Sequence, residues 1–218
     1  MTAADPAGPD WARRSLWGGL ALFALFGLLL ATGLTRWYDL PLDQWILRNV
    51  PPPDPNPEWG GLGYLSIWGS QYATIPVTIA TVMGLLAMGA VRTARIVGVV
   101  GFVGGLLILA FQVAFRPLLA WWGPDSGAQV VYPSGHLAGA AMAWGFAAFF
   151  LPLAGRPRQR WVRPLLATAW AGICLGVAAD RLLTRTHILS DLVGGWGLGV
   201  ALLGLALLLE RNPPKGAA

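Results

Sequence analysis

The 218-residue sequence is poor in charged residues, in cysteine and in lysine. Only 11% of its residues are charged, whereas a soluble domain usually carries about 25%, so the composition excludes an ordinary soluble fold. The single cysteine, Cys174, cannot form an internal disulfide and carries no information about the redox compartment. The sequence contains no repeat and no sign of a second domain, so we predict one membrane-embedded domain over residues 1–218.

Long apolar runs make up much of the sequence. Hydrophobic residues make up 56% of the chain. Formal charge is absent from residues 15–35, 59–91, 96–115, 126–155 (where only His136 can titrate), 164–179 and 192–209. A helix needs about 20 mostly apolar residues to cross a bilayer, so we predict an all-α polytopic membrane protein with six transmembrane helices. The first run is longer than the apolar part of a signal peptide, and we interpret it as a retained span.

Three segments lie outside the predicted spans. We expect a short cytoplasmic tail over residues 1–14, an outer segment over residues 36–58 and a C-terminal tail over residues 210–218. Apolar residues of the outer segment recur at roughly helical spacing and predict a short amphipathic helix on the membrane surface. The proline-rich stretch 51–57 that follows predicts an extended linker.

The basic residues are unevenly distributed around the predicted spans. With six spans both termini lie on one side, and cytoplasmic termini place ten of the fifteen basic residues inside and five outside. The inner set is Arg13, Arg14, Arg92, Arg95, Arg156, Arg158, Arg160, Arg163, Arg211 and Lys215. The positive-inside rule favours this orientation in the cell (inner or plasma) membrane. The basic loop 156–163 is too short for a nucleic-acid surface, so we expect membrane lipids and no nucleic acid as partners.

Both histidines of the chain lie in short polar motifs on the predicted extracytoplasmic side. His136 closes the motif Pro133-Ser134-Gly135-His136, in which proline and serine are typical of a helix start and Ser134 can cap it. A helix N-terminus offers free N–H groups and a partial positive charge, which suit a phosphate. Gly135 allows an anion to approach the backbone.

The second histidine is spaced from a carboxylate like a catalytic pair. His187 and Asp191 are four residues apart, so they share a helical face, and the carboxylate can orient the imidazole as a nucleophile or base. Arg116 and Arg181 can each present a guanidinium fork to phosphate oxygens. These residues together indicate phosphate chemistry on a lipid. Two histidines and an aspartate are also a metal-ligand set, but arginines beside them favour an anion, and we predict no metal and no other cofactor.

These motifs resemble those of the type-2 phosphatidic acid phosphatase superfamily, which includes lipid phosphatases and vanadium haloperoxidases. The family pattern is Lys-x6-Arg-Pro, then Pro-Ser-Gly-His, then Ser-Arg-x5-His-x3-Asp. This chain matches Arg116-Pro117, the whole Pro-Ser-Gly-His motif, and Arg181, His187 and Asp191 at the family spacing. The catalytic motifs then cover residues 109–191. The family lysine is replaced by Leu109 and the family serine by Asp180, and Gln112 or Arg185 is a possible substitute for the lysine.

The resemblance implies roles for the matched residues. His187 would attack phosphorus to form a phosphohistidine, Asp191 would orient it, and His136 would protonate the leaving oxygen. The side chains of Arg116, Arg181 and Ser134 and the N–H of Gly135 would bind the phosphoryl oxygens.

The function implied is a membrane phosphatase acting on a lipid phosphate or diphosphate. Undecaprenyl pyrophosphate is the favoured substrate, and phosphatidylglycerol phosphate and phosphatidate are the other candidates. A non-catalytic lipid-phosphate binder or transporter with the same fold is the alternative, because of Leu109 and Asp180. A haloperoxidase is disfavoured in so hydrophobic a chain.

Overall fold

The computed structural model describes residues 9–50, 64–119, 131–154 and 161–212, and all regular secondary structure in these residues is helical, which confirms the predicted all-α class. The elements in chain order are α1 (Pro9–Ala31), α2 (Arg36–Asn49), a 3₁₀ helix η1 (Leu65–Gly69), α3 (Gln71–Ala87), α4 (Val91–Leu119), α5 (Gly135–Ala154), α6 (Val162–Leu183) and α7 (Leu189–Arg211). The predicted N-terminal tail is therefore helical from residue 9. The predicted linker 51–57 lies outside the described residues.

Helices α5 and α7 form the centre of the bundle. Both are apolar around their whole circumference and most of their residues are buried, as expected for helices surrounded by other helices. The core includes Phe146 and Phe150 of α5 with Leu203 and Leu207 of α7. The outer helices α1, α3, α4 and α6 carry many exposed apolar side chains, which suit contact with lipid tails.

Within the residues that the structure describes, five helices are long and apolar enough to cross a membrane: α1, α4, α5, α6 and α7. The chain is thus a multi-pass membrane protein. The predicted span over residues 59–91 corresponds to η1 and α3, and α3 has 17 residues, which is about 26 Å of helix. This is a little short of a hydrocarbon core of about 30 Å, so the count of six spans stays a prediction.

The helices at the two ends of the chain, α1 and α7, make the most extensive helix–helix contact. Glycines allow their backbones to come close. A Cβ atom added to Gly197 would lie 2.8 Å from the carbonyl oxygen of Gly19, and one added to Gly204 would lie 2.6 Å from the nitrogen of Leu16. Small residues at such an interface permit the close packing that drives helix association in membranes.

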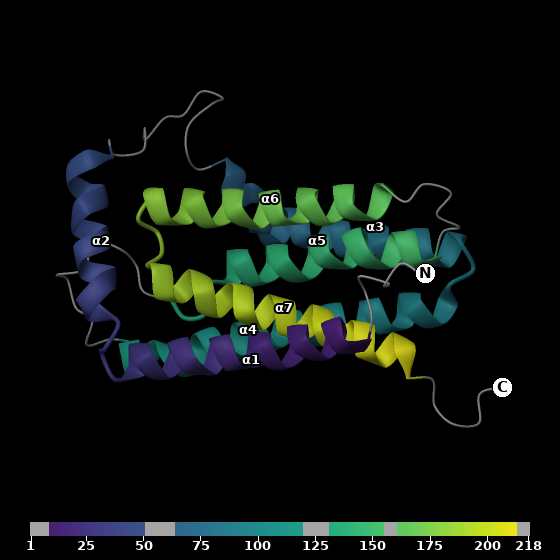
Figure 1. Cartoon of the computed structure of the whole chain (residues 1–218), viewed down its shortest axis with the longest axis horizontal. Helices are drawn as coiled ribbons and strands as arrows, with labels where there is room; N and C mark the ends of the chain where they lie inside the picture. The colour runs from purple at the N-terminus through teal and green to yellow at the C-terminus, as the bar shows by residue number, and fades with distance from the viewer. Residues whose placement is uncertain (1–8, 51–63, 120–130, 155–160, 213–218) are drawn as a thin grey trace.

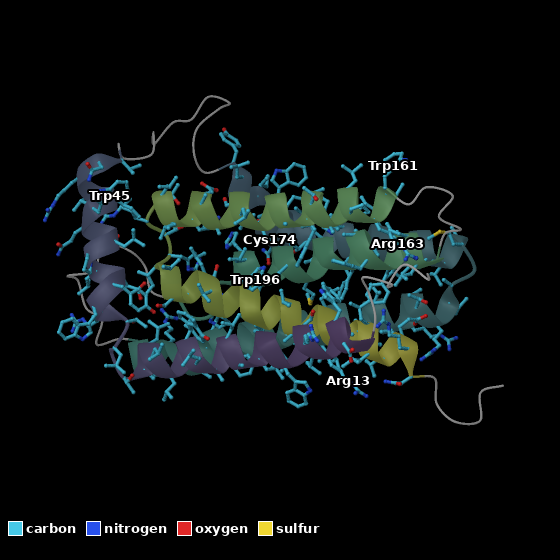
Figure 2. The ribbon with its side chains drawn as sticks, viewed as in Figure 1. Arg13, Trp45, Trp161, Arg163, Cys174 and Trp196 are labelled. Atoms are coloured by element: carbon cyan, nitrogen blue, oxygen red, sulfur yellow. The ribbon has the colours of Figure 1, made fainter. Side chains whose placement is uncertain are left out.

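Helix α2 lies across one end of the bundle, whereas α1 begins and α7 ends toward the other end (Figure 1). Trp45 lies on α2, whereas Arg13 and Arg163 lie toward the opposite end of the bundle (Figure 2). The C-terminal ends of α4 and α6 and the N-terminal ends of α5 and α7 point toward α2 (Figure 1). The predicted site residues belong to these four helix ends or to the segments next to them.

The close contact between α1 and α7 predicts the effect of enlarging one glycine. A Cβ atom on Gly19 would lie 2.7 Å from the nitrogen of Ala201, whereas nothing lies within 4 Å of one on the adjacent Gly18. Overpacking typically costs about 1–3 kcal/mol, more than the roughly 0.5–1 kcal/mol that alanine gains over glycine in a helix. We expect Gly19→Ala to lower the thermal midpoint in detergent and Gly18→Ala to leave it unchanged or raise it. Equal midpoints would contradict the tight α1–α7 interface.

Candidate active site

The starts of the two central helices are joined by a backbone hydrogen bond. The N–H of Ser134 donates to the carbonyl oxygen of Asp191 over 3.1 Å. Ser134 is fully buried, and its Oγ accepts a hydrogen bond from the N–H of Leu137 at 3.5 Å, as a residue that caps a helix start does. The Pro-Ser-Gly-His motif therefore begins helix α5, as the sequence predicts, and lies against the first turn of α7.

His187 and Asp191 form the predicted pair. The Nδ1 atom of His187 lies 3.1 Å from Oδ2 of Asp191, which also accepts a hydrogen bond from the N–H of Val131 at 3.2 Å. Asp191 is fully buried, and His187 is largely buried. With Asp191 ionised, Nδ1 is the donor, so the other ring nitrogen, Nε2, is deprotonated and carries the free lone pair of a nucleophile.

His136 faces this pair across a short gap. The centroids of the His136 and His187 rings are 6.3 Å apart. A guanidinium nitrogen of Arg181, in the last turn of α6, lies 2.8 Å from Nε2 of His136. Arginine is always a donor, so Nε2 of His136 accepts this bond and the proton of its neutral ring is on Nδ1. His136 thus lies close to both the ring of His187 and the guanidinium of Arg181.

Helix α4 approaches the start of α5 through Gln112, one turn before Arg116. Arg116 is in the last turn of α4 with an exposed side chain. Gln112, one turn earlier, donates a hydrogen bond to the carbonyl oxygen of Pro133 at 3.0 Å, and a Cβ atom on Gly135 would lie 2.8 Å from the amide nitrogen of Gln112. A side chain at position 135 would therefore require the amide end of Gln112 to shift.

Asp180, which replaces the family serine, and Arg185, a suggested substitute for the family lysine, both contact residues of other helices. Asp180 is fully buried and accepts a hydrogen bond from the N–H of Ser66 at 2.6 Å, which ties α6 to η1. Arg185 forms an ion pair with Asp43, with nitrogen–oxygen distances of 3.1 and 3.2 Å. Gln112 and Arg185 thus each have a partner within the protein, and the replacement of the missing lysine by either of them stays a prediction.

Leu109 lies in the wall of an open groove of about 930 Å³ between α3, α4 and α5. Its lining is mainly apolar and extends from His136 at one end to Met83 near the other end of α3. A groove of this volume is within the range of small-molecule sites. Its position next to a histidine of the site, on the side of the bundle, suits a long apolar chain.

Sequence reasoning missed the acidic residues of α2. Asp39, Asp43 and Ile46 are the buried residues of this helix, while Trp45, expected on its apolar face, is 57% exposed. The carboxylate of Asp39 accepts hydrogen bonds from the N–H and Oγ of Ser190. Burial raises the pKa of Asp39 to about 6. The spacing of four between the two aspartates was the available signal, because it places both on one helical face.

The metal-site alternative gains no support from the geometry. Within the described part of the chain, no group of three or more histidine, cysteine, aspartate or glutamate side chains is arranged to hold a metal ion. The neighbour of His136 at hydrogen-bond distance is instead the guanidinium of Arg181. A cationic neighbour of this kind suits an anion.

Comparison with known proteins gives the class of the protein. The sequence matches the PAP2 superfamily over residues 94–214, more than half of its length. The chain belongs to the PAP2 superfamily, the family that the motifs predict, and its class is that of the PAP2-type membrane lipid phosphatases. The match covers all of the predicted site residues.

One solved structure shares the fold. It is described as the first transmembrane PAP2 type phosphatidylglycerolphosphate phosphatase from Bacillus subtilis. The TM-score is 0.69, the sequence identity is 19%, and the alignment covers 91% of this chain and 98% of that one. The likeness therefore extends over almost the whole chain, including α1 and α2, which precede the family match. No curated protein matches the sequence.

The contact between His187 and Asp191 predicts the effect of removing the negative charge. We expect Asp191→Asn to reduce kcat by about 10⁴-fold, the loss seen when the orienting acid of a catalytic histidine is amidated and the wrong tautomer is favoured. Asp180→Asn is the matched comparison, because Asp180 is equally buried but holds Ser66, and its loss should be much smaller. The measurement is phosphate release at saturating substrate. Similar kcat values for the two variants would contradict the orienting role.

Proposed function

We propose that the protein hydrolyses a phosphomonoester or diphosphate of a lipid through a phosphohistidine on His187. The observation that carries the proposal is the pairing of Nδ1 of His187 with Asp191, which leaves Nε2 unoccupied by Asp191, in a ring that lies close to His136, the neighbour of Arg181. An imidazole with one nitrogen held by a carboxylate is an activated nucleophile. A guanidinium on the opposite side is suited to hold phosphoryl oxygens.

The proposed reaction has two steps. In the first, Nε2 of His187 bonds to phosphorus while the bond from phosphorus to the lipid oxygen breaks, and His136 gives its proton to that oxygen. In the second, His136 takes a proton from water, whose oxygen attacks phosphorus and releases inorganic phosphate and free His187. For His136 to act as the acid at Nε2, Arg181 must exchange its bond to this nitrogen for one to the phosphate, and Nε2 must take up a proton from solvent, so that the ring enters the first step as an imidazolium and leaves it neutral.

Phosphate binding in the proposed site combines side chains with helix ends. Arg181 and Arg116 supply formal positive charge. The N–H of Gly135 and the capped turn at Ser134 supply the partial charge of the α5 N-terminus. These donors would stabilise the oxygens as negative charge shifts in the transition state, the contribution that is usually the largest in such sites.

The groove beside His136 supports a lipid rather than a soluble substrate. It lies on the outer surface of the bundle between α3 and α4, and it includes Leu109 where family members carry lysine. An apolar wall gives an alkyl chain a favourable environment. Undecaprenyl pyrophosphate stays the prediction of the sequence, while the structural relative of Bacillus subtilis is named for phosphatidylglycerol phosphate, so both belong in the first assay with phosphatidate.

The alternative of a non-catalytic binder has less support. It was based on the presence of Leu109 and Asp180, and the structure gives a structural role to each of these residues. Leu109 lines the groove, and Asp180 holds the backbone of Ser66. Neither residue blocks the pair formed by His187 and Asp191.

The orientation in the membrane is part of the proposal. We place the α2 end of the bundle, with the active site, on the extracytoplasmic face, and both termini in the cytoplasm. Arg13 and Arg163 lie at the end with the termini (Figure 2), and the positive-inside rule assigns such an end to the cytoplasm.

The proposed orientation can be tested with two matched cysteines in a Cys174→Ser background. Trp45 and Trp161 lie at opposite ends of the bundle (Figure 2), and each is 57% exposed. In intact cells, Trp45→Cys should react with a membrane-impermeant thiol reagent, and Trp161→Cys should react only after the membrane is permeabilised. The reverse result would place the active site in the cytoplasm.

The proposed mechanism is tested with purified protein in detergent and a panel of the three lipid phosphates, with and without a chelator. We expect phosphate release from at least one lipid, no release by His187→Ala, and acid-labile labelled phosphate on the wild-type chain after rapid quenching. His136→Ala should slow release by about 10²–10⁴-fold, the usual contribution of general acid–base catalysis. Activity of His187→Ala near that of wild type would disprove the mechanism, and binding without turnover would favour the binder.

A further inference from the structure

The two aspartates of helix α2 face the helices of the bundle. It lies across the end of the bundle near the starts of α5 and α7 (Figure 1). Asp39 and Asp43 are 2% and 8% exposed, and they are one helical turn apart. A buried carboxylate is costly unless it is paired or accepts hydrogen bonds, so the partners of these residues indicate what α2 does.

Asp39 supplies a helix cap that the sequence of α7 lacks. The residue before α7 is Ile188, which has no side-chain acceptor, and no side-chain cap is formed there. The Oδ1 of Asp39 instead accepts a hydrogen bond from the N–H of Ser190, at 3.3 Å, and its Oδ2 accepts one from Oγ of Ser190 at 2.6 Å. Tyr38 adds a third contact, with its hydroxyl 2.8 Å from the same Oγ. A residue of another helix thus fixes the first turn of α7, which contains Asp191.

Asp43 holds the other side of the same segment. Both of its oxygens are within 3.2 Å of guanidinium nitrogens of Arg185, in a two-point ion pair. Arg185 has a φ of 58°, a left-handed conformation that residues with a side chain rarely adopt. Such a conformation persists where the surroundings enforce it, and the contact with Asp43 is one such constraint.

His187 lies between these two points of attachment. Ser190 follows it by three residues and Arg185 precedes it by two, so α2 holds the short connection from α6 to α7 on both sides of the histidine. We propose that Asp39 and Asp43 are positioning residues that fix the backbone of residues 185–190 and thereby aim His187 at the phosphoryl group. The proposal rests on the proposed function of His187 as the nucleophile.

The positioning role makes a different prediction from a purely structural role. A displaced nucleophile slows the chemical step, and a misplacement of about 1 Å can cost about 10²-fold in rate. Groove and phosphate contacts do not involve α2, so KM should be preserved. A purely structural role would instead lower the thermal midpoint and the fraction of folded protein, with kcat of the folded part unchanged.

The test compares Asp43→Ala and Asp39→Asn with Gln44→Ala, an exposed neighbour on the same helix. Amidation of Asp39 keeps its shape but replaces one acceptor with a donor group. We expect both aspartate variants to lose between about tenfold and 10²-fold in the kcat of the folded protein, with little change in KM, whatever the loss of the cap or ion pair does to the thermal midpoint. Gln44→Ala should match the wild type. If the aspartate variants fold and retain the kcat of Gln44→Ala, the positioning role is wrong.

A charge exchange provides the second measurement. Asp43→Arg combined with Arg185→Asp restores an ion pair of the opposite sense, and aspartate tolerates the left-handed conformation at position 185 better than most residues. We expect the double variant to recover much of the kcat lost by Asp43→Arg alone. A double variant that folds but is no faster than the single variant would overturn the role of Asp43, even if Asp43→Ala does not fold.

Failure of this inference is distinguishable from failure of the proposed function. The wild type and His187→Ala are assayed in the same series. If the wild type releases no phosphate, or if His187→Ala retains release, the proposed function fails. If both behave as proposed and the aspartate variants behave like Gln44→Ala, only the positioning role fails.

Discussion

The hydrogen bond between the N–H of Ser134 and the carbonyl oxygen of Asp191 joins the starts of α5 and α7. Both helices are buried in the bundle, and glycines of α7 allow the α5 backbone to approach them. A Cβ atom on Gly195 would meet the backbone and side chain of Ser134, and one on Gly199 would meet Ala138. The two helices are therefore held in a fixed register. Because His136 is in the first turn of α5 and His187 lies just before α7, this register sets the distance between the two imidazoles.

Formal positive charge is scarce in this arrangement. Arg181 lies against His136, whereas Arg116 is exposed at the end of α4 and Arg185 is paired with Asp43. The N-terminal ends of α5 and α7 lie together at this end of the bundle, and their helix dipoles provide a second source of positive potential. An anion site built in this way depends on helix placement more than on the number of basic residues. This offers a physical reason why the proposed site can work with Leu109 in place of lysine.

The polar residues at the α2 end of the bundle form two connected groups. Asp191 and His187 belong to the proposed chemistry, while Asp39, Asp43 and Ser190 hold the segment that carries them. Buried carboxylates of this kind cost free energy unless their acceptors are used. The cost is offset here by contacts between elements that are far apart in the sequence. The α2 end of the bundle is thereby fixed without a large apolar interface between α2 and the other helices.

The sequence determined the fold class, the apolar helices and the residues of the chemical motifs, because hydropathy, helical spacing and residue type are local properties. His187 and Asp191 were found from their spacing of four, and Pro133 and Ser134 from their preference for a helix start. The tertiary structure decided which helices are central, where the groove runs, and that Gln112 and Arg185 are committed to other partners. It also brought Asp39 to Ser190 and Asp43 to Arg185, across about 150 residues of chain. Those contacts depend on how α2 lies across the bundle, which no local pattern encodes.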